Sequence, residues 1–567
     1  MHPMKDLIEK YVLKNSIEFW GNVNVNAVLG KVLGEHPELR ADVKAVVREI
    51  QTIAKAIKKI QVDEQRKKLE KIAPEMLEKK EHVREDRLVL PGGIKGNVVM
   101  RFAPSPSGPL HIGHAYVLSL NSELCKKYDG KLLLRLEDTN PENIDDNAYH
   151  MIPEDAQWLT RGNVADMVIQ SERLGQYYDA AEKLVDMGHG YVCTCDPDTF
   201  KKLLKLGKAC PCRGLNPKEQ HVRYDKMFGE YKPGEVVLRL KTDIGHKNPA
   251  MRDFPLMRIN DHPHPKQGTK HRVWPLMNFS VAVDDHLLGV THTLRGKDHM
   301  DNEKRQKMIA DYLGWDVPVA LYVGRTNFTD MKLSTTETKR LILEGRYTGW
   351  DDIRLPFLPA LRRRGYQPDA FIQQALDVGI TENDKKTSTE EFFKSVNHFN
   401  KEVVDVQANR YFFIWDPVPL HIDGAPRREV TIELHPDFHA RGHREFLTGE
   451  DFLVTKKDFD VFTAKKVHRL MDCANFVRKG EGFVFESHDY NHFKNAKNQG
   501  IIAHWLPADE KPVPVVVKKE DGSEVSGVGE HGLAALHEGA IVQLERFGFC
   551  RLDKKEKNKL VFWHLHR

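Results

Sequence analysis

The chain has 567 residues, which is too long for a single hydrophobic core, and we expect about three to five modules. Apolar residues make up 40% and charged residues 30% of the sequence, with a mean hydropathy of −0.53, which excludes an intrinsically disordered chain. No apolar run approaches the roughly 18 residues that span a bilayer, and the first residues lack the apolar run of a secretory signal. We therefore expect a cytoplasmic protein without a membrane partner.

The formal net charge is only +4, from 86 Lys and Arg against 82 Asp and Glu, which excludes a uniformly basic coat for nucleic acid. Any surface that binds RNA must then be local. The candidates are Arg362, Arg363 and Arg364, the lysines in 554–559, and the lysine-rich stretch 55–80. The alternative for each of these is a solvated surface without a partner.

The first 95 residues are predicted to form a helical N-terminal domain. Apolar residues recur every three or four positions between 39 and 60, which predicts an amphipathic helix. The stripe consists of Val43, Val46, Val47, Ile50, Ile53, Ile57 and Ile60. Residues 7–33 also have a helical pattern, and the charged tract 63–85 is expected to be a solvated helix. A cluster of turn residues, Pro91, Gly92, Gly93 and Gly96, predicts the linker that follows.

The next part of the chain has the pattern of an α/β domain. Between residues 98 and 138 the order strand, loop, helix, strand predicts a βαβ unit. The expected elements are strands at 98–103 and 131–138, helices at 111–128 and 172–188, and later strands at 236–242 and 286–296.

The segment 101–115, RFAPSPSGPLHIGHA, carries the strongest chemical signal. His111 and His114 lie three positions apart at the start of a helix, where free N–H groups and the helix dipole favour an anion. Their imidazoles could donate hydrogen bonds to the α-phosphate of a nucleotide, and Gly113 would let the nucleotide approach the backbone. Two prolines, the first of them Pro104, make the preceding turn rigid. The alternative, two histidines on an ordinary helix, is disfavoured by this context.

The sequence HIGH at 111–114 is the signature of class I aminoacyl-tRNA synthetases, and the whole segment resembles their glutamyl/glutaminyl subgroup, in particular the archaeal and eukaryotic glutamyl type. Similar stretches recur as RLEDTNP at 135–141, DDHLLGVTHTLRGKDH at 284–299 and GWDDIRLPFLPALRRRG at 349–365. The resemblance implies a multidomain α/β fold. A class I Rossmann-type catalytic domain carries an insertion, with helical N-terminal and linking domains and a C-terminal β-barrel anticodon-binding region. The implied boundaries are 96–190 and 271–330 for the two catalytic halves, 191–270 for the insertion, 331–396 for the signature loop with the helical stem-contact region, and 397–567 for the barrels.

A second lobe should supply cations to the pyrophosphate leaving group, because Lys and Mg²⁺ can neutralise the charge of this transition state. In the family this is the KMSKS loop. Its best counterpart is KLSTT, which keeps Lys332 and Ser334 as catalytic residues but has Thr335 where the second lysine stands. Either Lys332 works with a neighbour such as Lys339, or activation is weakened, or the segment is an ordinary surface loop. The implied contacts of ATP, with Mg²⁺ as its companion ion, are Pro104, Gly113, His114 and Lys332.

Recognition of a γ-carboxylate calls for a guanidinium fork, whereas a neutral amide is met by uncharged donors and acceptors. Arg101 resembles the family arginine that faces the substrate side chain. Arg295 stands where glutamyl enzymes carry an arginine and glutaminyl enzymes a smaller uncharged residue. Two cations for one carboxylate favour glutamate. The alternative for Arg295 is a structural salt bridge with Asp298.

Further residues complete the expected substrate site. Ser105 matches the glutamyl pattern, and Glu137 with Asp138 would hold the α-ammonium group by opposite charge. Met277 stands where a tyrosine often contacts the substrate in the family, which removes one expected hydrogen bond.

Four of the seven cysteines lie in one short segment: Cys193, Cys195, Cys210 and Cys212. Their C-x-C, spacer, C-x-C pattern can close a tetrahedral structural site around Zn²⁺ with four thiolates. A three-cysteine site or reduced thiols without metal are the alternatives. The resemblance favours zinc, since glutamyl enzymes often carry it in this insertion. The other cysteines, Cys125, Cys473 and Cys550, are expected to be buried apolar side chains.

The resemblance implies that the insertion contacts the acceptor end of tRNA, that residues 333–396 contact the inner corner of the L-shaped tRNA, and that the C-terminal region binds the anticodon. From about residue 411 onward, short β-branched runs broken by turns predict an all-β region, with a hairpin signal at Asp521–Gly522. Unpaired anticodon bases could stack on aromatic side chains. The candidates are Tyr411, Phe412, Phe413 and Trp415, for which core packing is the alternative.

The implied function is ATP-dependent activation of glutamate to glutamyl-adenylate, followed by transfer to the 3′ end of tRNA(Glu). Charging of tRNA(Gln) with glutamate stays open. A glutaminyl-tRNA synthetase and a non-catalytic tRNA-binding paralogue are the alternatives; Arg295 disfavours the first and Thr335 motivates the second. The resemblance also implies a monomer whose N-terminal helices contact other translation factors.

Overall fold

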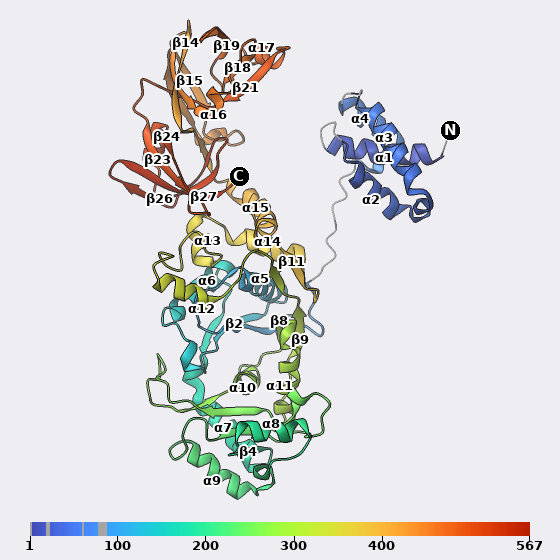
Figure 1. Cartoon of the computed structure of the whole chain (residues 1–567), viewed down its shortest axis with the longest axis vertical. Coiled ribbons are helices and arrows are strands. Elements are labelled where there is room, and N and C mark those ends of the chain that lie inside the picture. Colours follow the sequence, from blue (N-terminus) through green and yellow to red (C-terminus); the bar gives the residue numbers. More distant parts are fainter. Residues whose placement is uncertain (1–2, 19–22, 59, 61, 77–87) are drawn as a thin grey trace. The chain divides into compact units, whose positions relative to one another are not determined.

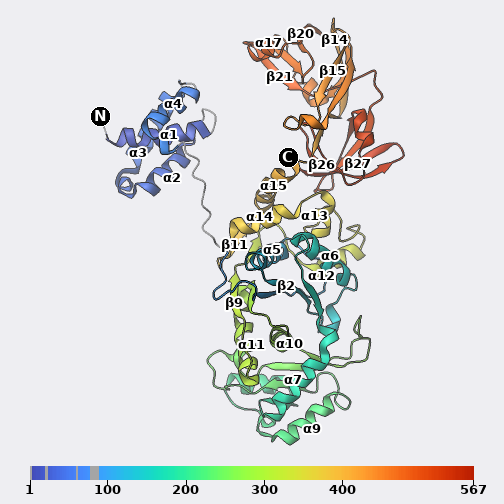
Figure 2. The same ribbon diagram turned by 180° about the vertical axis from the view of Figure 1, so that it is seen from behind.

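The computed structural model describes residues 3–18, 23–58, 60, 62–76 and 88–567, and the chain divides into two compact units, Met1–Asp86 and Arg87–Arg567. Figures 1 and 2 draw both units. The division falls before the predicted turn cluster at 91–96, and Leu90 is already buried in a core of the second unit. No helix within the described ranges is long and apolar enough to cross a membrane.

The first unit consists of helices around an apolar core (Figure 1). Its helices are α1 (Pro3–Glu18), α2 (Val25–Glu35), α3 (Val43–Ile57) and α4 (Val62–Ile72). Helix α3 begins after Asp42, whose side chain accepts a hydrogen bond from the N–H of Ala45 at 3.0 Å. The buried residues of α3 are Val46, Ile50, Ile53 and Ile57, which confirms the centre of the predicted stripe, whereas Val43 at its start is 38% exposed. Of the predicted solvated helix 63–85, the part to Ile72 is helical, and 77–85 lie outside the described residues.

Five strands form the centre of the second unit in two hydrogen-bonded groups, each of them parallel. The first group is β3 (Asp166–Ile169), β2 (Lys131–Leu136) and β1 (Val99–Phe102), and the second is β8 (His292–Gly296) with β9 (Val319–Val323). Thr291 joins the groups, because its N–H donates to the carbonyl of Val99 at 2.9 Å. The order across the five strands is therefore β3, β2, β1, β8, β9, and its direction changes between β1 and β8. Doubly wound parallel sheets bind their ligands at such a change of direction, beyond the carboxyl ends of the strands. The predicted Rossmann-type domain is confirmed.

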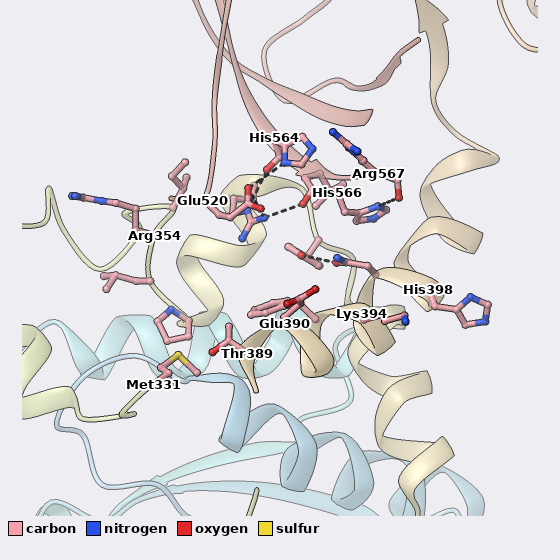
Figure 3. Close-up of a pocket in the computed structure, with 18 of the residues that line it drawn as sticks. Met331, Arg354, Thr389, Glu390, Lys394, His398, Glu520, His564, His566 and Arg567 are labelled. Carbon is pink, nitrogen blue, oxygen red and sulfur yellow. Dashed lines mark hydrogen bonds and ion pairs between the residues drawn. The ribbon is translucent and has the colours of Figure 1, made fainter. Parts of the chain in front are cut away.

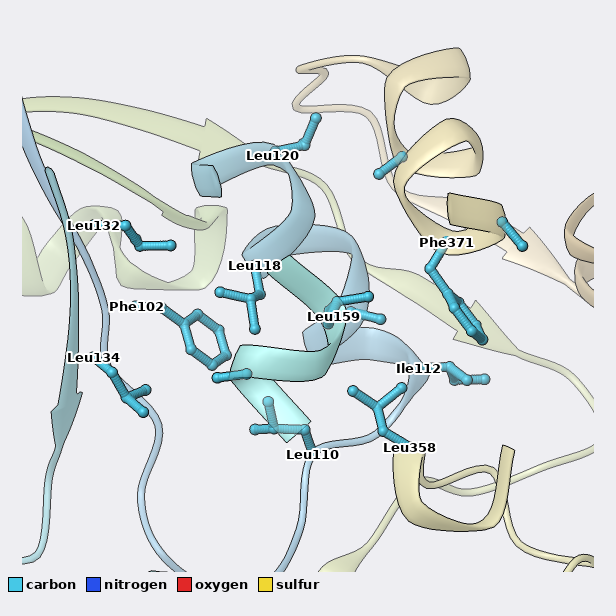
Figure 4. Close-up of a cluster of buried hydrophobic side chains, with 14 of the residues drawn as sticks. Phe102, Leu110, Ile112, Leu118, Leu120, Leu132, Leu134, Leu159, Leu358 and Phe371 are labelled. Atoms are coloured by element: carbon cyan, nitrogen blue, oxygen red, sulfur yellow. The ribbon is translucent and has the colours of Figure 1, made fainter. Parts of the chain in front are cut away.

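Helices α5 (Ile112–Lys127) and α6 (Ala148–Thr160) pack on this sheet, and Figure 4 shows the core that they share with it. The core includes Phe102, Leu132 and Leu134 from the strands, Leu118 and Leu159 from the helices, and Leu358 and Phe371 from α13 (Leu358–Arg364) and α14 (Pro368–Val378). Burying each leucine contributes about 2 kcal/mol. The linking helices are thus packed onto the catalytic domain and hold a fixed place beside it.

The predicted strand at 286–296 is wrong in its first half. Helix α10 (Met277–Leu287) runs into this segment, and Gly289 turns the chain with a φ of +63° before β8 begins. Glycine adopts this left-handed backbone at little cost and commonly ends helices. The N–H of Val290 donates to the carbonyl of Asp285 at 2.9 Å, which closes the helix end. The apolar run before Gly289 therefore ends a helix.

The insertion is built on an antiparallel sheet of β4 (Gly190–Cys193), β5 (Val237–Leu240), β6 (Pro255–Ile259) and β7 (Val273–Pro275). Its neighbouring helices are α7 (Leu174–Asp186), α8 (Pro197–Lys205), α9 (Pro217–Met227) and α11 (Met300–Leu313). Tyr177, Trp274 and Phe279 belong to one core that joins α7 and α10 to this sheet. The insertion is therefore continuous with the catalytic domain.

The signature loop lies between β10 (Thr326–Phe328) and α12 (Thr335–Leu343), and β10 pairs in parallel with β11 (Lys385–Thr387). Helix α15 (Thr389–Asp405) follows β11. The carboxylate of Asp330 accepts from the N–H and the hydroxyl of Thr389, both at 2.9 Å. The start of the signature loop is thus fixed to the N-terminus of a long helix.

From residue 409 onward the chain is mostly β, as predicted, and forms two seven-stranded sheets. In order across the first sheet are β12 (Asn409–Tyr411), β25 (Ile541–Leu544), β26 (Gly548–Glu556), β27 (Lys559–His566), β23 (Val513–Lys518), β24 (Glu524–Gly529) and β13 (Phe413–Trp415). Across the second are β21 (Gln499–Ala503), β18 (Val467–Leu470), β19 (Asn475–Lys479), β20 (Gly482–Ser487), β14 (Pro417–Asp423), β17 (Asp451–Thr455) and β22 (Leu506–Pro507). The remaining elements are the hairpin β15 (Arg428–Glu433) and β16 (His443–Thr448) with the short helices α16 (Lys456–Phe459) and α17 (Tyr490–Lys494).

The predicted hairpin and barrel region are confirmed. Strands β23 and β24 pair antiparallel around Gly522, which has a φ of +84°. The sheets enclose separate apolar cores, one around Phe476 and Trp505 and the other around Val515 and Phe562. Each sheet therefore folds around its own interior.

The arginine run 362–364 lies at the joint between α13 and the first of these sheets. Arg363 binds Asp553, with 3.1 Å between Nη2 and Oδ2, and Arg364 donates from Nη2 to the carbonyl of Leu565 at 2.9 Å. Arg362 pairs with Glu154 at 3.0 Å. Arg363 and Arg364 thus tie α13 to the first sheet and Arg362 ties it to α6, and RNA binding by these arginines stays a prediction.

A cavity of about 850 Å³ opens beside this joint (Figure 3). Its walls come from the loop around Arg354, from α15 and from the end of β27. On one wall the carboxylate of Glu520 lies 3.1 Å from Nδ1 of His564 and 3.7 Å from Nη2 of Arg364. The joint is thus partly polar and not a continuous apolar seam.

Candidate active site

His111 and His114 form the first turn of α5, with rings stacked at 3.8 Å between centroids and 17° between planes. Nδ1 of His111 accepts from the N–H of Gly113 at 3.1 Å, and Nδ1 of His114 accepts from the N–H of His111 at 3.4 Å. Because each Nδ1 is an acceptor, the proton of each neutral ring lies on Nε2. Both rings can therefore donate from Nε2 to an anion at the helix start.

Both rings are neutral at pH 7. Burial lowers the pKa of His111 to about 4. Burial, together with the nearby His111, holds the pKa of His114 well below its usual value. Neutral donors bind a phosphate more strongly as its charge grows, so their stabilisation is greatest in the transition state.

A cavity of about 850 Å³ opens in front of this turn. Its lining includes His111, Gly113 and His114, then Gly296, Gly324, Arg325, Lys332 and Lys385. The cavity lies beyond the carboxyl ends of β8 and β9, where doubly wound sheets bind ligands. Its volume is typical of pockets that take small molecules or cofactors. It is the candidate nucleotide site.

Residues of the signature loop face different ways. Lys332 lines the cavity with its side chain 82% exposed, and its Nζ lies 3.5 Å from Oε2 of Glu337. Ser334 caps α12 instead, since its Oγ accepts from the N–H of Glu337 at 3.3 Å. Nζ of Lys339 lies 3.1 Å from Oδ2 of Asp145. Of these three side chains only Lys332 lines the cavity, whereas Lys339 is directed to Asp145.

Sequence reasoning missed two cations of this cavity, Arg325 after β9 and Lys385 in β11. Arg325 Nη2 lies 3.7 Å from Oδ2 of Asp298, the residue considered as an alternative partner of Arg295. No motif marks either cation, because the parallel pairing of β10 with β11 brings Lys385 to the site. They add positive charge where phosphates would lie.

Arg101 is buried at the end of β1, with its Nε 3.3 Å from Oδ1 of Asp285 on α10. Arg135, fully buried in β2, donates from Nη1 to the same oxygen at 2.6 Å. Burial would raise the pKa of Asp285, but Arg101 and Arg135 outweigh it and lower the pKa below its usual value. Asp285 therefore stays ionised and holds both guanidinium groups in place.

Arg295 lies near Arg101, and burial followed by the charge of Arg101 lowers the pKa of Arg295. Its Nη2 donates to Oε1 of Gln306 at 3.1 Å. Its buried Nε has no hydrogen-bond partner among the described residues. Two guanidinium groups that repel each other, one with an unsatisfied donor, favour an incoming carboxylate.

Glu137 faces this group and Asp138 does not. Arg135 donates from Nη2 to Oε1 of Glu137 at 3.0 Å, while burial raises the pKa of Glu137 against the opposing charge of Arg135. Asp138 is buried and accepts from the N–H and hydroxyl of Ser171 and the hydroxyl of Tyr149, each at 2.7 Å. These bonds give Asp138 a structural task, so Glu137 alone remains well placed for the α-ammonium group.

Three further residues were discussed for the site from the sequence: Ser105, Pro104 and Met277. Ser105 is exposed, and its carbonyl accepts from the N–H of Ser107 at 2.9 Å. Pro104 is buried, and its carbonyl accepts from the N–H of Glu137 at 3.0 Å, which ties the turn to the end of β2. Met277 Sδ lies 3.9 Å from Nε2 of Gln306, directly behind Arg295 in the same network.

The four clustered cysteines converge, with all their Sγ atoms within 4.8 Å of one another. The Sγ atoms of Cys193 and Cys210 lie 3.8 Å apart, as do those of Cys195 and Cys212. Four sulfurs about 2.3 Å from one zinc ion in a tetrahedron lie about 3.8 Å apart, so this donor set fits zinc. Nη1 of Arg223 lies 3.4 Å from Sγ of Cys212 and can offset thiolate charge. The other cysteines, Cys125, Cys473 and Cys550, are buried as predicted.

The aromatic candidates for base stacking lie inside the C-terminal sheets. Tyr411, Phe412 and Phe413 are buried, and Trp415 packs against the core of the first sheet. Core packing, which was weighed against base stacking for these residues, is therefore confirmed for Tyr411, Phe412 and Phe413, while Trp415 is only partly buried.

Residues 97–406 match the sequence model of the catalytic domain of the class I tRNA synthetases (E and Q), and 408–489 and 476–553 match models of their anti-codon binding domain. With the sheet, the histidine turn and the signature loop, this defines a tRNA synthetase of class I. A glutamate–tRNA ligase of Methanococcus maripaludis is 44% identical over 568 residues, which cover 100% of both chains. The chain therefore belongs to the class I synthetase family for glutamate and glutamine, among its archaeal-type glutamate–tRNA ligases.

Further relatives agree. Glutamate–tRNA ligases of Methanocaldococcus jannaschii and Pyrococcus abyssi are each 43% identical, covering 100% and 98% of this chain and 100% and 99% of theirs. Among solved structures, a glutamate tRNA ligase from Elizabethkingia meningosepticum in complex with its amino acid is 18% identical with a TM-score of 0.39, covering 55% of this chain and 70% of that one.

Proposed function

We propose that this chain joins glutamate to tRNA in two steps at the site described above. In the first, the α-carboxylate of glutamate attacks the α-phosphate of ATP, and pyrophosphate leaves with the electron pair of the broken P–O bond. In the second, a terminal ribose hydroxyl of the tRNA attacks the acyl carbon of glutamyl-adenylate and loses its proton, and AMP leaves. The observation that carries this proposal is the neutral histidine pair, whose Nε2 donors belong to a nucleotide-sized cavity that Lys332 also lines.

The histidine turn and the signature loop divide the work on ATP. His111 and His114 donate to the α-phosphate, Gly113 lets the nucleotide approach the backbone, and Lys332 neutralises the pyrophosphate. Mg²⁺ bound with ATP would supply further positive charge. Arg325 joins Lys332 as a second cation of this cavity.

Arg101 and Arg295 are proposed to bind the γ-carboxylate, and Glu137 the α-ammonium group. The support is electrostatic: the two arginines repel each other, and the Nε of Arg295 is buried without a partner among the described residues. A carboxylate between the two arginines lowers their mutual repulsion and accepts a hydrogen bond from the free Nε–H. The neutral amide of glutamine can accept this hydrogen bond but does not lower the repulsion. The site therefore favours glutamate.

We propose tRNA(Glu) as the acceptor and extend the proposal to tRNA(Gln). The amino acid subsite is built from β1, β2, β8, α10 and α11, without a residue of the C-terminal sheets. Selection of glutamate thus needs no contribution from the part of the chain that resembles anticodon-binding domains. The insertion at 191–270 is proposed to take the acceptor end, and residues 333–396 the inner corner of the tRNA.

Zinc is proposed as a structural ion held by Cys193, Cys195, Cys210 and Cys212. The ion would join β4 to the segment before α9 by closing this loop, and it has no part in the chemistry. We further propose that the chain acts as a cytoplasmic monomer, and that its N-terminal helices contact other translation factors.

Aminoacylation with labelled glutamate tests the proposal, with purified tRNA(Glu) and tRNA(Gln) offered separately. We expect both to be charged with glutamate and neither with glutamine. Lys332→Ala and His114→Ala should each lower kcat by roughly 10²-fold or more, since each removes a contact made most strongly in the transition state. Wild-type kinetics in both variants would contradict the assigned roles.

A further inference from the structure

Helix α12 is attached to the turn that precedes the histidine pair by two contacts from one of its faces. Oγ1 of Thr335 lies 3.1 Å from Oγ of Ser107. One helical turn later, Nζ of Lys339 lies 3.1 Å from Oδ2 of Asp145, whose own N–H donates to the carbonyl of Pro106 at 2.8 Å. Positions four apart lie on the same helix face, so α12 reaches this turn directly at Ser107 and indirectly through Asp145, which is bonded to the neighbouring Pro106.

The two contacts differ in exposure. In the ion pair the side chain of Asp145 is only 7% exposed, whereas that of Lys339 is 44% exposed, so water reaches the pair from the lysine side. A Cβ atom at Gly108 would lie 3.4 Å from Cγ2 of Thr335 and 3.1 Å from the ring of Trp350. Thr335 thus packs its methyl group against Gly108 and turns its hydroxyl to Ser107. A lysine at position 335 would lack both the β-methyl group and the hydroxyl.

We propose that Thr335 and Lys339, with Ser107 and Asp145, form a clamp that holds the signature loop closed and thereby positions Lys332. Thr335 is then a positioning residue that replaces a charge by a hydrogen bond. The inference deepens the proposed function, because it rests on Lys332 acting on the leaving group. Lys339 is then part of the clamp and does not stand in for the missing lysine, because it is directed to Asp145 and does not line the nucleotide cavity.

Loss of the clamp should lower kcat/KM for ATP and leave the KM for glutamate unchanged. Lys332 stands three residues before Thr335, with its side chain 82% exposed and its Nζ 3.5 Å from Oε2 of Glu337 on α12, so the place of its ammonium group depends on how the loop and the start of α12 are held. Releasing Thr335 lets the loop open, which weakens ATP binding and slows pyrophosphate departure. Arg101 and Arg295 lie on other strands, so the KM for glutamate should not change.

Steady-state pyrophosphate exchange in the presence of tRNA tests this with four single variants. Thr335→Val removes the hydroxyl and keeps the shape, and we expect kcat/KM for ATP to fall about fivefold or more, the usual worth of a hydrogen bond. Thr335→Ser keeps the hydroxyl and should return kcat/KM to within about twofold of wild type. Ser107→Ala should match Thr335→Val. Thr336→Val, at the exposed neighbouring position, is the matched control and should behave like wild type.

The double variant Ser107→Ala with Thr335→Val should lose no more than either single variant, because both remove one bond. Thr335→Lys restores the family lysine and separates the two explanations. The clamp predicts a slower enzyme, whereas a site that had merely lost its second cation would become faster. A faster Thr335→Lys variant, additive losses in the double variant, or wild-type kinetics in both Thr335→Val and Ser107→Ala would each overturn the proposal.

Thermal unfolding of each variant shows whether its fold is intact. If Thr335→Val is unstable, Ser107→Ala is used in its place to test the clamp. Failure of the proposed function would look different. Wild-type chain would then show no exchange with glutamate at all, whereas failure of the clamp leaves wild-type exchange intact and abolishes only the difference between Val and Ser at position 335.

Discussion

Arg295 donates from Nη2 to Oε1 of Gln306 at 3.1 Å, while Nε2 of the same glutamine lies 3.3 Å from Oδ1 of Asn278. The second bond fixes which end of the Gln306 amide faces Arg295, since Asn278 offers an acceptor. Gln306 is 6% exposed, so few other rotamers are open to it. The direction of the Arg295 guanidinium is therefore set from behind by a neutral side chain that leaves its charge uncompensated.

Replacement of Gln306 should weaken glutamate binding through Arg295. In Gln306→Leu the guanidinium loses its acceptor, and we expect the KM for glutamate to rise about tenfold with the KM for ATP unchanged. Gln306→Glu should lose more, because its carboxylate neutralises Arg295 and competes with the substrate. Lys307→Ala, an exposed change on the same helix, is the control. Equal effects on both KM values would show that Gln306 serves only the fold.

Arg295→Ala should lower kcat/KM for glutamate by roughly 10² to 10³-fold, since a charged hydrogen-bonding group is removed from a largely buried site. The fold should survive, because the change also removes repulsion between Arg295 and Arg101. Glutamate-dependent exchange and thermal unfolding measure the two effects. Wild-type glutamate kinetics in this variant would remove Arg295 from the substrate site.

The carboxyl group of Asp155, on α6, lies beneath the histidine turn and makes the free energy of unfolding depend on pH. Its Oδ2 accepts from the N–H of Leu110 at 3.1 Å, and its buried Oδ1 has no partner among the described residues. Burial raises the pKa of Asp155 to about 7, and the N–H of Leu110 only partly opposes this. In unfolded chain the group titrates near 3.9, so between about pH 4 and pH 7 the folded state binds more protons. Its contribution to stability is present below this window and is lost as the pH rises through it.

Asp155→Asn keeps the acceptor for Leu110 and removes the ionisation. We expect the stability of the variant relative to wild type to grow by about 2 kcal/mol from pH 5 to pH 8. Urea unfolding at both pH values, followed by a probe of the catalytic domain, measures this difference. A difference that is the same at pH 5 and pH 8 would contradict the raised pKa.

Removal of any cluster cysteine should release zinc. Cys210→Ser leaves three thiolates, and we expect the variant to lose bound zinc in metal analysis and to lose the thiolate charge-transfer bands of a cobalt-substituted site. Cys125→Ala, which changes a buried cysteine outside the cluster, should retain the metal. Activation of glutamate should suffer less than transfer to tRNA, because the cluster lies in the insertion. Full zinc content in Cys210→Ser would contradict a four-cysteine site.

Local pattern identified much of this molecule. The apolar run 98–103 and the prolines, glycines and histidines of residues 104–114 sufficed to predict a strand, a turn and an anion-binding helix start, because each element depends on neighbours in sequence. The stripe of α3 and the Asp521–Gly522 hairpin were predictable for the same reason. The strand predicted at 286–296 was wrong in its first half because apolar residues before a glycine fit the end of a helix as well as a strand.

Contacts across the sheet were not predictable in this way. Arg101 and Asp285 are 184 positions apart, and Ser107 and Thr335 are 228 apart, so each pair depends on the strand order and not on any local spacing. Asp138 follows Glu137 directly after β2, yet their side chains bind different partners, and only the structure shows that Glu137 meets Arg135 whereas Asp138 is bound by Ser171. The arginines at 362–364 suggested a surface because sequence does not reveal that Arg363 pairs with Asp553 or that Arg364 donates to the carbonyl of Leu565 at the end of β27.

The central claim is that Arg295, whose buried Nε has no hydrogen-bond partner among the described residues, selects glutamate together with Arg101, and pyrophosphate exchange tests it most directly. Wild-type chain is incubated with ATP, tRNA and either glutamate or glutamine, and kcat/KM is compared for the two amino acids. We predict exchange with glutamate that exceeds exchange with glutamine by at least about 10³-fold, as expected when a buried charged site meets a neutral analogue. Comparable exchange with glutamine, or exchange with glutamine alone, would contradict the account.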